Sequence, residues 1–387
     1  MSRITPYLGI VVALILGVFI VAFSGSVTIV RTAETQTASS TLSVVSSFSL
    51  PSLSLSSLQP EKNSTTTTPT PITVVPKKTK VPSAPSSSTS TSSVPTVTQP
   101  VSAPMKLTSS GNISLDDSAS ALRGALVNII CYVPPGSSLH SMSGSGIIID
   151  PKGIILTNAH IAQYFLLTDR GVSCTIRSGS PAIDKYDAAL IYISPAWLRA
   201  NASVLTEVSP SGTGEYDFAL LAITKSETST VLPSSFPSLP LAQLPPALGT
   251  PVVIASYGAQ FLETNQVQSS LFPTIVFGSV KEIFTFAVNT IDVLGLGGSA
   301  AAQEGSSGGG VSDSSGNLIG TITTSTILGA TDTRSLDAIT ASYIRAQYAT
   351  ETGEAINLLL AEPTATAIAD FVPRMPKLEA ILTAHLP

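Results

Sequence analysis

Three residues of the types needed for nucleophilic catalysis occur in the order His160, Asp217 and Ser307 along this chain of 387 residues. A serine hydroxyl is a weak nucleophile at neutral pH and needs a base within hydrogen-bond reach to remove its proton. Histidine suits that task, and a carboxylate holds its imidazole in the required tautomer. The pattern therefore predicts Ser307 as nucleophile, His160 as general base and acid, and Asp217 as the orienting carboxylate.

Glycines surround the predicted nucleophile, because residues 305–309 read GSSGG. A backbone that turns sharply and points N–H groups at a developing oxyanion has no room for bulky side chains. The amides of Gly305 and Ser307 are the expected oxyanion-hole donors. Taken alone, the segment could equally be a flexible loop, and His160 and Asp217 could be structural residues.

The elements around the candidates decide between these interpretations. Short apolar runs bounded by turn residues predict strands at 144–149, 154–156, 218–223 and 318–323. The sequence DPKG at 150–153 predicts a tight turn between the first two of these strands. Each candidate then lies at a strand end or on a connecting loop, where a rigid β-scaffold can aim its side chain.

With these motifs in place, the segment from about 124 to 346 resembles a trypsin-like serine protease, most closely the bacterial HtrA/DegP-type branch. The resemblance rests on SGSGIIID at 143–150, GIILTNAH at 153–160, LGTPVVIASYG at 248–258, GSSGG at 305–309 and LIGTI at 318–322. It implies an all-β fold of two six-stranded antiparallel β-barrels with a C-terminal helix. It also implies hydrolysis of peptide bonds through an acyl-enzyme, protein or peptide substrates, and no cofactor.

The same resemblance assigns roles to four further residues. Thr323 takes the place of a residue that in the family helps to hold the aspartate. Ala301, six residues before the predicted nucleophile, corresponds to the floor of the primary substrate pocket, and its wall corresponds to Thr323, Thr324 and Ser325. This uncharged pocket predicts a small or aliphatic side chain before the scissile bond.

The sequence departs from the family pattern in several places. Gly310 stands where proline is usual, and Ser306 replaces the usual Asn or Asp. The stretch between His160 and Asp217 is longer than in the bacterial branch, which predicts an inserted loop around 194–214. The residues after 348 are too few for a PDZ domain.

The chain has two cysteines, Cys131 and Cys174. In an exported protein an even number suggests a bridge, and in trypsin-like folds the corresponding strands come close, which together predict a disulfide. Two buried thiols are the alternative. Clusters of Cys and His with metal-ligand spacing are missing from the sequence, so no metal site is predicted.

The first part of the chain predicts export. Residues 4–30 carry no charge, and residues 7–23 are nearly all apolar, which is long enough for most of a bilayer crossing. Residues 1–30 are therefore interpreted as an N-terminal transmembrane anchor, with a cleaved signal peptide as the alternative. The expected location is membrane-anchored with the protease domain outside the cytoplasm, or else secreted after cleavage.

Composition then divides the remainder of the chain. Residues 31–110 are rich in Ser, Thr and Pro and predict a disordered linker, because such a segment buries too little apolar surface to fold. Residues 111–348 form the predicted protease domain and residues 349–387 a C-terminal helical tail. The net charge is −5, and the chain has no basic patch of the kind that nucleic acid requires. The oligomeric state is not indicated.

A second function, from another class, is consistent with the same fold. A trypsin-like domain that is catalytically silent or latent could act as a surface-tethered protein-binding module. The complete set of His160, Asp217 and Ser307 favours the enzyme over this alternative.

Overall fold

The computed structural model describes residues 79–80, 113–207, 212–228, 230–326, 329–384 and 386. The expected membrane anchor or signal segment at 1–30, and all of the expected linker except residues 79–80, lie outside the described residues. Every helix within the described ranges is too short or too polar to cross a bilayer.

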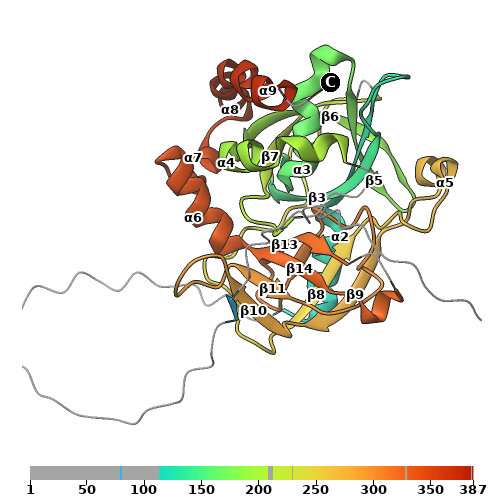
Figure 1. Ribbon diagram of the computed structural model, residues 1–387. Coiled ribbons are helices and arrows are strands. Elements are labelled where there is room, and N and C mark those ends of the chain that lie inside the picture. The colour runs from blue at the N-terminus through green and yellow to red at the C-terminus, as the bar shows by residue number, and fades with distance from the viewer. Residues whose placement is uncertain are drawn as a thin grey trace, which may run out of the picture. The chain divides into compact units, whose positions relative to one another are not determined.

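The first sheet closes into an antiparallel barrel (Figure 1). Its six strands are β2 (Leu126–Tyr132), β3 (Met142–Asp150), β4 (Ile154–Thr157), β5 (Ser173–Gly179), β6 (Ala182–Ile193) and β7 (Ala219–Ser226). They follow one another around the barrel in the order β2-β3-β4-β7-β6-β5. This barrel confirms the first of the two predicted β-barrels.

The second sheet has eight strands in the order β1-β10-β11-β14-β13-β12-β8-β9. They are β1 (Thr79–Lys80), β8 (Pro251–Ser256), β9 (Thr274–Ser279), β10 (Glu282–Thr285), β11 (Val293–Gly295), β12 (Gly310–Ser312), β13 (Leu318–Ser325) and β14 (Leu336–Thr340). Strand β1 lies within the segment expected to be disordered, and it pairs with β10 at the edge of the sheet.

The expectation of a second closed, six-stranded barrel therefore needs correction. Between β9 and β10 the chain turns a corner, where Val280 N–H donates to Thr250 O at 3.0 Å and Lys281 N–H donates to Gly295 O at 2.8 Å. The two neighbouring residues thus pair with different strands. The corner interrupts the ladder that would close the barrel and leaves a curved, open sheet.

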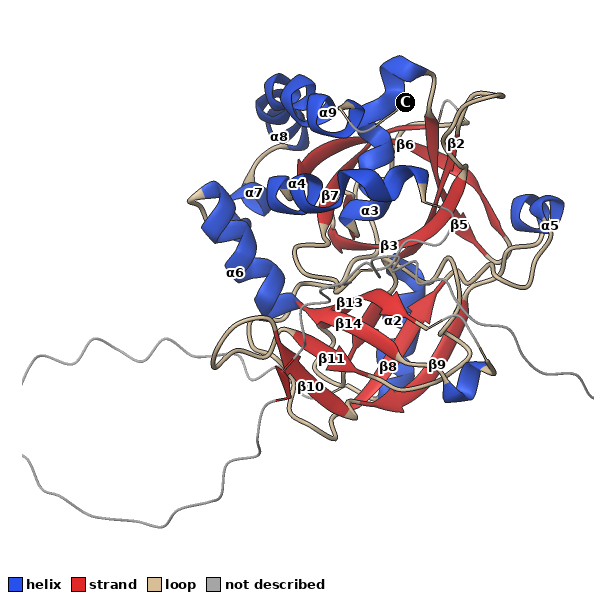
Figure 2. Ribbon diagram, viewed as in Figure 1, coloured by secondary structure: helices blue, strands red, loops and turns tan. Residues whose placement is uncertain are grey.

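Helices cover the two sheets and join them (Figure 2). They are α2 (Leu115–Ala125), α3 (Ala159–Ala162), η1 (Gln163–Arg170), α4 (Pro195–Asn201), η2 (Ala202–Thr206), α5 (Thr264–Ser269), η3 (Thr331–Thr333), α6 (Ala341–Thr352), α7 (Ile356–Ala361), α8 (Thr364–Phe371), η4 (Val372–Arg374) and α9 (Met375–Thr383). Helix α2 packs against β3 of the barrel and against β8 and β12 of the open sheet, so it joins the two.

The hairpin before His160 follows its sequence closely. Gly153 has a φ of +89°, which favours glycine, and its N–H donates to Asp150 O at 2.9 Å. The Asp150 side chain also accepts a hydrogen bond from Lys152 N–H at 2.9 Å. These contacts confirm the predicted turn, and β4 then leads directly to His160.

Cys131 on β2 and Cys174 on β5 form a disulfide. The two residues are direct partners across the antiparallel pair of strands. The bond therefore joins two neighbouring strands of the barrel and closes a loop that contains β3, β4 and the helix that carries His160.

The expected insertion at 194–214 contains α4 and η2, and the C-terminal helices pack on it. Helix α9 contacts α4, η1 and η2, while α8 contacts β6. Glu351 of α6 accepts hydrogen bonds from the Ser194 hydroxyl at 2.8 Å and from Ala196 N–H at 3.3 Å, at the start of α4. The C-terminal helices thus form part of the folded domain.

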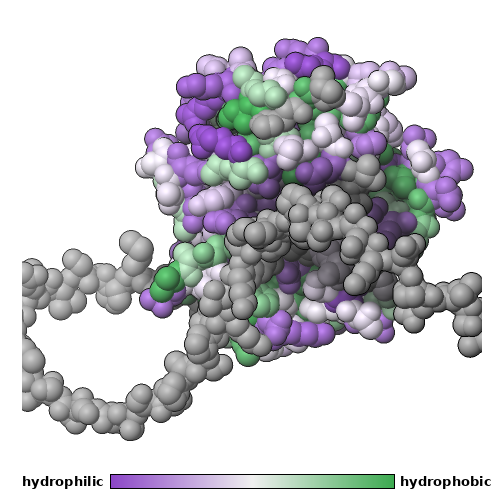
Figure 3. Space-filling view, viewed as in Figure 1, coloured by the Kyte–Doolittle hydropathy of each residue, from purple (hydrophilic) through white to green (hydrophobic). Residues whose placement is uncertain are grey.

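On the face shown in Figure 3, hydrophilic and apolar residues are interspersed over the described surface.

The packing of α9 yields a stability prediction. Leu382 is fully buried, whereas Leu358 on α7 is 54% exposed. Leu382→Ala should lower the free energy of unfolding by about 2–4 kcal/mol, because it leaves a cavity in the core. Leu358→Ala is the control and should change it by less than about 0.5 kcal/mol. Urea unfolding followed by circular dichroism measures both; equal effects would contradict the packing of α9.

Candidate active site

The carboxylate of Asp217 is the centre of the candidate site. Asp217 lies just before β7 and is only 4% exposed. Its Oδ1 accepts the backbone N–H of His160 at 3.0 Å, and its Oδ2 lies 2.8 Å from His160 Nδ1. The Thr323 hydroxyl donates to the same Oδ2 at 2.8 Å. In the neutral tautomer that donates its Nδ1 proton to this carboxylate, Nε2 carries a lone pair that can accept another proton.

The turn that carries Asp217 has an unusual backbone. Tyr216 has a φ of +57°, a conformation that is uncommon for residues other than glycine. Its N–H donates to the hydroxyl of Tyr343 at 3.1 Å, and Asn158 Nδ2 donates to Asp217 O at 2.9 Å. Helix α6, which begins at Ala341, therefore contributes to the position of the carboxylate through Tyr343.

Electrostatics near this turn are shaped by burial. Burial raises the pKa of the Glu215 carboxyl, and the negative charge of Asp292 raises it further. Burial also raises the pKa of the Tyr343 hydroxyl above its ordinary value. A tyrosine hydroxyl is already protonated at neutral pH, and the raised pKa extends this neutral form of Tyr343, the partner of Tyr216 N–H, to more alkaline solution.

Ser307 lies on the loop before β12 and is held from both sheets. Ser145 N–H, on β3 of the barrel, donates to Ser307 O at 2.8 Å. Gly308 N–H donates to Ile322 O at 2.9 Å, next to the Thr323 that binds Asp217. The Ser307 backbone is thus attached to β3 on one side and to β13 on the other, and β13 carries a partner of the Asp217 carboxylate.

The strands approach so closely here that glycine is required. Gly308 has a φ of +82°, and a Cβ atom added to it would lie 1.9 Å from Ser145 O and 2.6 Å from Thr157 Oγ1. Thr157 ends β4, three residues before His160. The small residue after Ser307 therefore lets the open sheet pack directly against the strand that leads to His160.

The loop before Ser307 leaves two backbone donors available. Within the described ranges, no acceptor takes a hydrogen bond from the N–H of Gly305 or of Ser307, whereas Ser306 N–H donates to Gln303 O at 3.2 Å. Two such N–H groups can stabilise an oxyanion. Among the contacts of the described residues, none joins Ser307 Oγ to His160.

The residues expected to line the substrate pocket are placed as follows. Ala301 is fully buried, and Thr323 is 5% exposed with its hydroxyl on Asp217. Ser325 is partly exposed at the end of β13. The Thr324 side chain lies outside what the structure describes, although its backbone pairs with Asp337 in β14.

The sequence did not single out Ser145, which holds the loop from the opposite sheet. Its hydroxyl donates to Gly305 O at 2.8 Å and accepts Tyr257 N–H at 2.9 Å, and its side chain is fully buried. The only local signal is a serine between two glycines, Gly144 and Gly146, in strand β3. That pattern shows a crowded strand but does not identify the partner.

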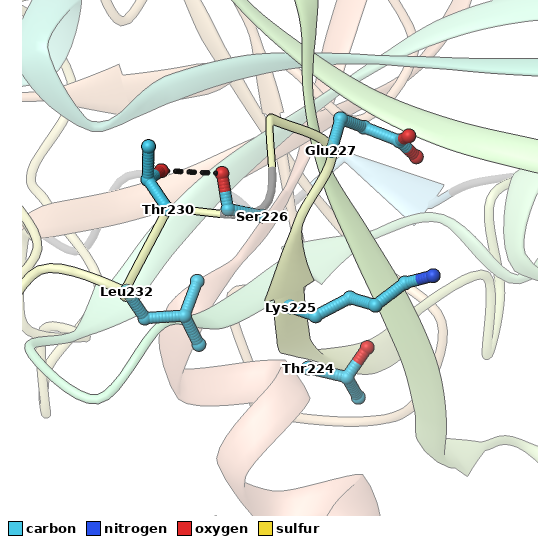
Figure 4. Close-up of a pocket in the computed structure, with 6 residues that line it drawn as sticks. All are labelled: Thr224, Lys225, Ser226, Glu227, Thr230 and Leu232. Carbon is cyan, nitrogen blue, oxygen red and sulfur yellow. Dashed lines mark hydrogen bonds between the residues drawn. The ribbon is translucent and has the colours of Figure 1, made fainter.

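A separate pocket lies at the end of β7 (Figure 4). It is lined by Thr224, Lys225, Ser226, Glu227, Thr230 and Leu232. None of these is a site residue predicted from the sequence, and the Lys225 ammonium pairs with Asp187 at 2.7 Å. Groups of His, Cys, Asp or Glu able to hold a metal ion are absent from the part of the chain that the structure describes.

The close approach at Gly308 gives a prediction that compares two glycines. Gly136 has a φ of +79°, nearly that of Gly308, but an added Cβ there would meet nothing within 4 Å. Gly136→Ala should cost about 1 kcal/mol from backbone strain alone. Gly308→Ala should cost at least about 2 kcal/mol more, because the methyl group overlaps Ser145 O. Urea unfolding of both variants measures the difference, and equal costs would contradict the contact.

Residues 144–320 match the family model described as a trypsin-like peptidase domain. No curated protein matches the chain.

Solved structures similar to this chain include forms of the Rv3671c protease from Mycobacterium tuberculosis. The active form is 20% identical, with 65% of this chain and 95% of that chain covered and a TM-score of 0.39. A serine-to-alanine mutant of the protein from strain H37Rv, in its inactive form, is 20% identical, with 66% of this chain and 97% of that chain covered and a TM-score of 0.38. Residues 144–320 are therefore similar to a trypsin-like peptidase domain, over a little less than half of the 387-residue chain.

Proposed function

We propose that this protein is a serine endopeptidase that hydrolyses peptide bonds with Ser307, His160 and Asp217. The observation that carries the proposal is the Asp217 carboxylate, which receives His160 Nδ1 and the Thr323 hydroxyl, each at 2.8 Å. Ser307 O accepts Ser145 N–H of β3, and the N–H of the following Gly308 donates to Ile322 O, next to Thr323. The family match of residues 144–320 supports the same class of reaction.

In the proposed reaction, the Ser307 hydroxyl attacks the carbonyl carbon of a peptide bond while His160 Nε2 takes its proton. Asp217 stays ionised and stabilises the imidazolium that forms. The His160 ring then gives the proton to the leaving amine, which departs and leaves an acyl-enzyme on Ser307. A water molecule, activated by the same ring, hydrolyses this ester and restores the serine. Binding of a substrate tightens the approach of Ser307 and His160 that the reaction requires.

The oxyanion formed during attack needs fixed donors. The N–H groups of Gly305 and Ser307 fill this role in the proposal, because within the described ranges neither donates to the protein. Gly305 has a φ of +85°, which a residue with a side chain would adopt only with strain. The Ser145 hydroxyl, which binds Gly305 O at 2.8 Å, helps to fix the direction of this loop.

The proposed substrates are proteins or peptides with an uncharged side chain before the scissile bond. The proposal rests on Ala301 and on Thr323, Thr324 and Ser325, the residues that correspond to the pocket in trypsin-like proteases. The apolar run at 7–23 supports action outside the cytoplasm, from a membrane anchor or after secretion.

Labelling with a fluorophosphonate probe tests the catalytic proposal. The full-length chain should be labelled on Ser307, since the probe reacts only with a serine whose base and oxyanion donors are assembled. Ser307→Ala should abolish labelling, and Asp217→Asn should slow it by about 10³–10⁴-fold, because the imidazole loses its orienting carboxylate. In-gel fluorescence against time measures the rates. A folded wild-type chain that is not labelled would instead favour the silent, protein-binding module.

A peptide library tests the proposed specificity. The wild-type protein should cleave mainly after small or aliphatic residues, because the floor of the proposed pocket is Ala301 and carries no charge. Mass spectrometry of the products identifies the bonds that are cut, with Ser307→Ala as the control for contaminating proteases. Cleavage mainly after Arg or Lys would refute the assignment of the pocket.

A further inference from the structure

Arg334, between η3 and β14, is a buried cation close to the loop that carries the candidate oxyanion donors. It is only 6% exposed. Its Nη1 donates to Ala302 O at 2.7 Å and to Gln260 Oε1 at 2.6 Å. Its Nε and Nη2 donate to Gly329 O at 3.0 and 2.8 Å. One guanidinium therefore connects three segments that lie far apart in the sequence.

The acceptors around Arg334 are all uncharged oxygens. Within the described ranges no carboxylate lies within ion-pair distance of the guanidinium, and its nearest aromatic contact is the ring of Phe261, 5.7 Å from Arg334 Cζ. Removing a charge from water without an opposite charge is costly. We therefore expect the contribution of Arg334 to lie in its geometry. The planar guanidinium fork donates to several acceptors in fixed directions at once.

The segment that Arg334 binds leads directly into the candidate oxyanion hole. Ala302 lies three residues before Gly305, and the backbone carbonyl of Glu304, one of the two residues between them, accepts Ala259 N–H at 2.8 Å. Gln260, the next residue after Ala259, is itself bound by Arg334 at 2.6 Å. Arg334 thus binds both the 302–305 segment, through Ala302 O, and the neighbouring loop at 259–260, through Gln260.

A close backbone contact strengthens this junction. A Cβ added to Gly298 would lie 2.1 Å from Asp332 O, so the segments before Ala302 and before Arg334 touch without side chains between them. Leu296 N–H also donates to Leu336 O at 2.8 Å. The position of Arg334 relative to Ala302 is therefore fixed on both sides by the backbone.

We propose that Arg334 is a positioning residue for the oxyanion hole: by binding Ala302 O, Gln260 and Gly329 O together, it holds residues 302–305 so that the Gly305 N–H faces the reacting carbonyl. The inference rests on the proposed function, because an oxyanion hole has a role only if the protein catalyses acyl transfer. Arg334 does not touch the reacting atoms; it acts through the loop.

The test compares Arg334→Lys with Arg345→Lys in the full-length chain. Arg345, on α6, is a matched control because it too binds two backbone carbonyls and one side-chain amide oxygen: Leu241 O at 2.7 Å, Ala242 O at 3.0 Å and Asn357 Oδ1 at 2.7 Å. Lysine is the closest cationic substitute for arginine in both variants, but it lacks the planar fork. Circular dichroism first establishes a temperature at which both variants are folded.

Two measurements follow on each variant. Hydrogen exchange should become faster in peptides covering residues 300–306 of Arg334→Lys, and should stay unchanged there in Arg345→Lys. The rate constant for labelling by the fluorophosphonate probe should fall by about 10–100-fold in Arg334→Lys, somewhat less than for direct loss of an oxyanion donor, and should stay near the wild-type value in Arg345→Lys.

The outcomes separate this inference from the proposed function. Unchanged exchange at 300–306 in Arg334→Lys would overturn the positioning role, whatever the labelling shows. Faster exchange with the same labelling rate as Arg345→Lys would overturn its link to the oxyanion hole. A wild-type chain that is not labelled at all would refute the proposed function and the link with it, whereas the exchange measurement would still decide whether Arg334 holds the loop.

Discussion

The buried carboxylate of Asp217 is the constraint on which the rest of the structure depends. At 4% exposure its charge needs partners, and it receives the His160 backbone and ring from the barrel and the Thr323 hydroxyl from the open sheet. A charge removed from water is tolerated only when it is fully hydrogen-bonded. The carboxylate therefore ties the orientation of the imidazole to the relative position of the two sheets, and neither can shift alone without leaving a buried charge unpaired.

The second constraint is steric and lies where the loop that carries Ser307 meets β3. Ser145 N–H binds Ser307 O at 2.8 Å, and the absence of a side chain at Gly308 allows that contact. Close backbone packing of this kind fixes a loop more firmly than side-chain contacts do, because it leaves no rotamers to vary. The loop that carries Ser307 is thereby placed by one sheet and restrained by the other, which suits the nucleophile of the proposed reaction, whose hydroxyl must point in one direction.

The helical elements outside the sheets extend this rigidity to the barrel. Glu351 binds the start of α4, and Tyr192 donates to the same carboxylate. Helix α9 packs on η1, which continues the helix that carries His160. Tyr343, on α6, holds the backbone of Tyr216 next to Asp217. The part of the chain after β14 thus supports the residues of the barrel that form the site.

Local sequence determined much of this protein. The DPKG turn and the apolar runs beside it act over a few residues, so the hairpin before His160 could be predicted. The glycines around Ser307 predicted a sharp turn, but taken alone they were equally consistent with a flexible loop. The order of His160, Asp217 and Ser307 indicated the chemistry, and the structure brings His160, Asp217 and Thr323 into contact. Only the tertiary structure decided the contacts of Ser145, Tyr343 and Arg334, because each binds a backbone group far away in the sequence. The tertiary structure also decided that the second sheet is open at Val280. At that corner the neighbouring residues Val280 and Lys281 form hydrogen bonds with two different parts of the sheet, and no local sequence pattern indicates which partner each will take.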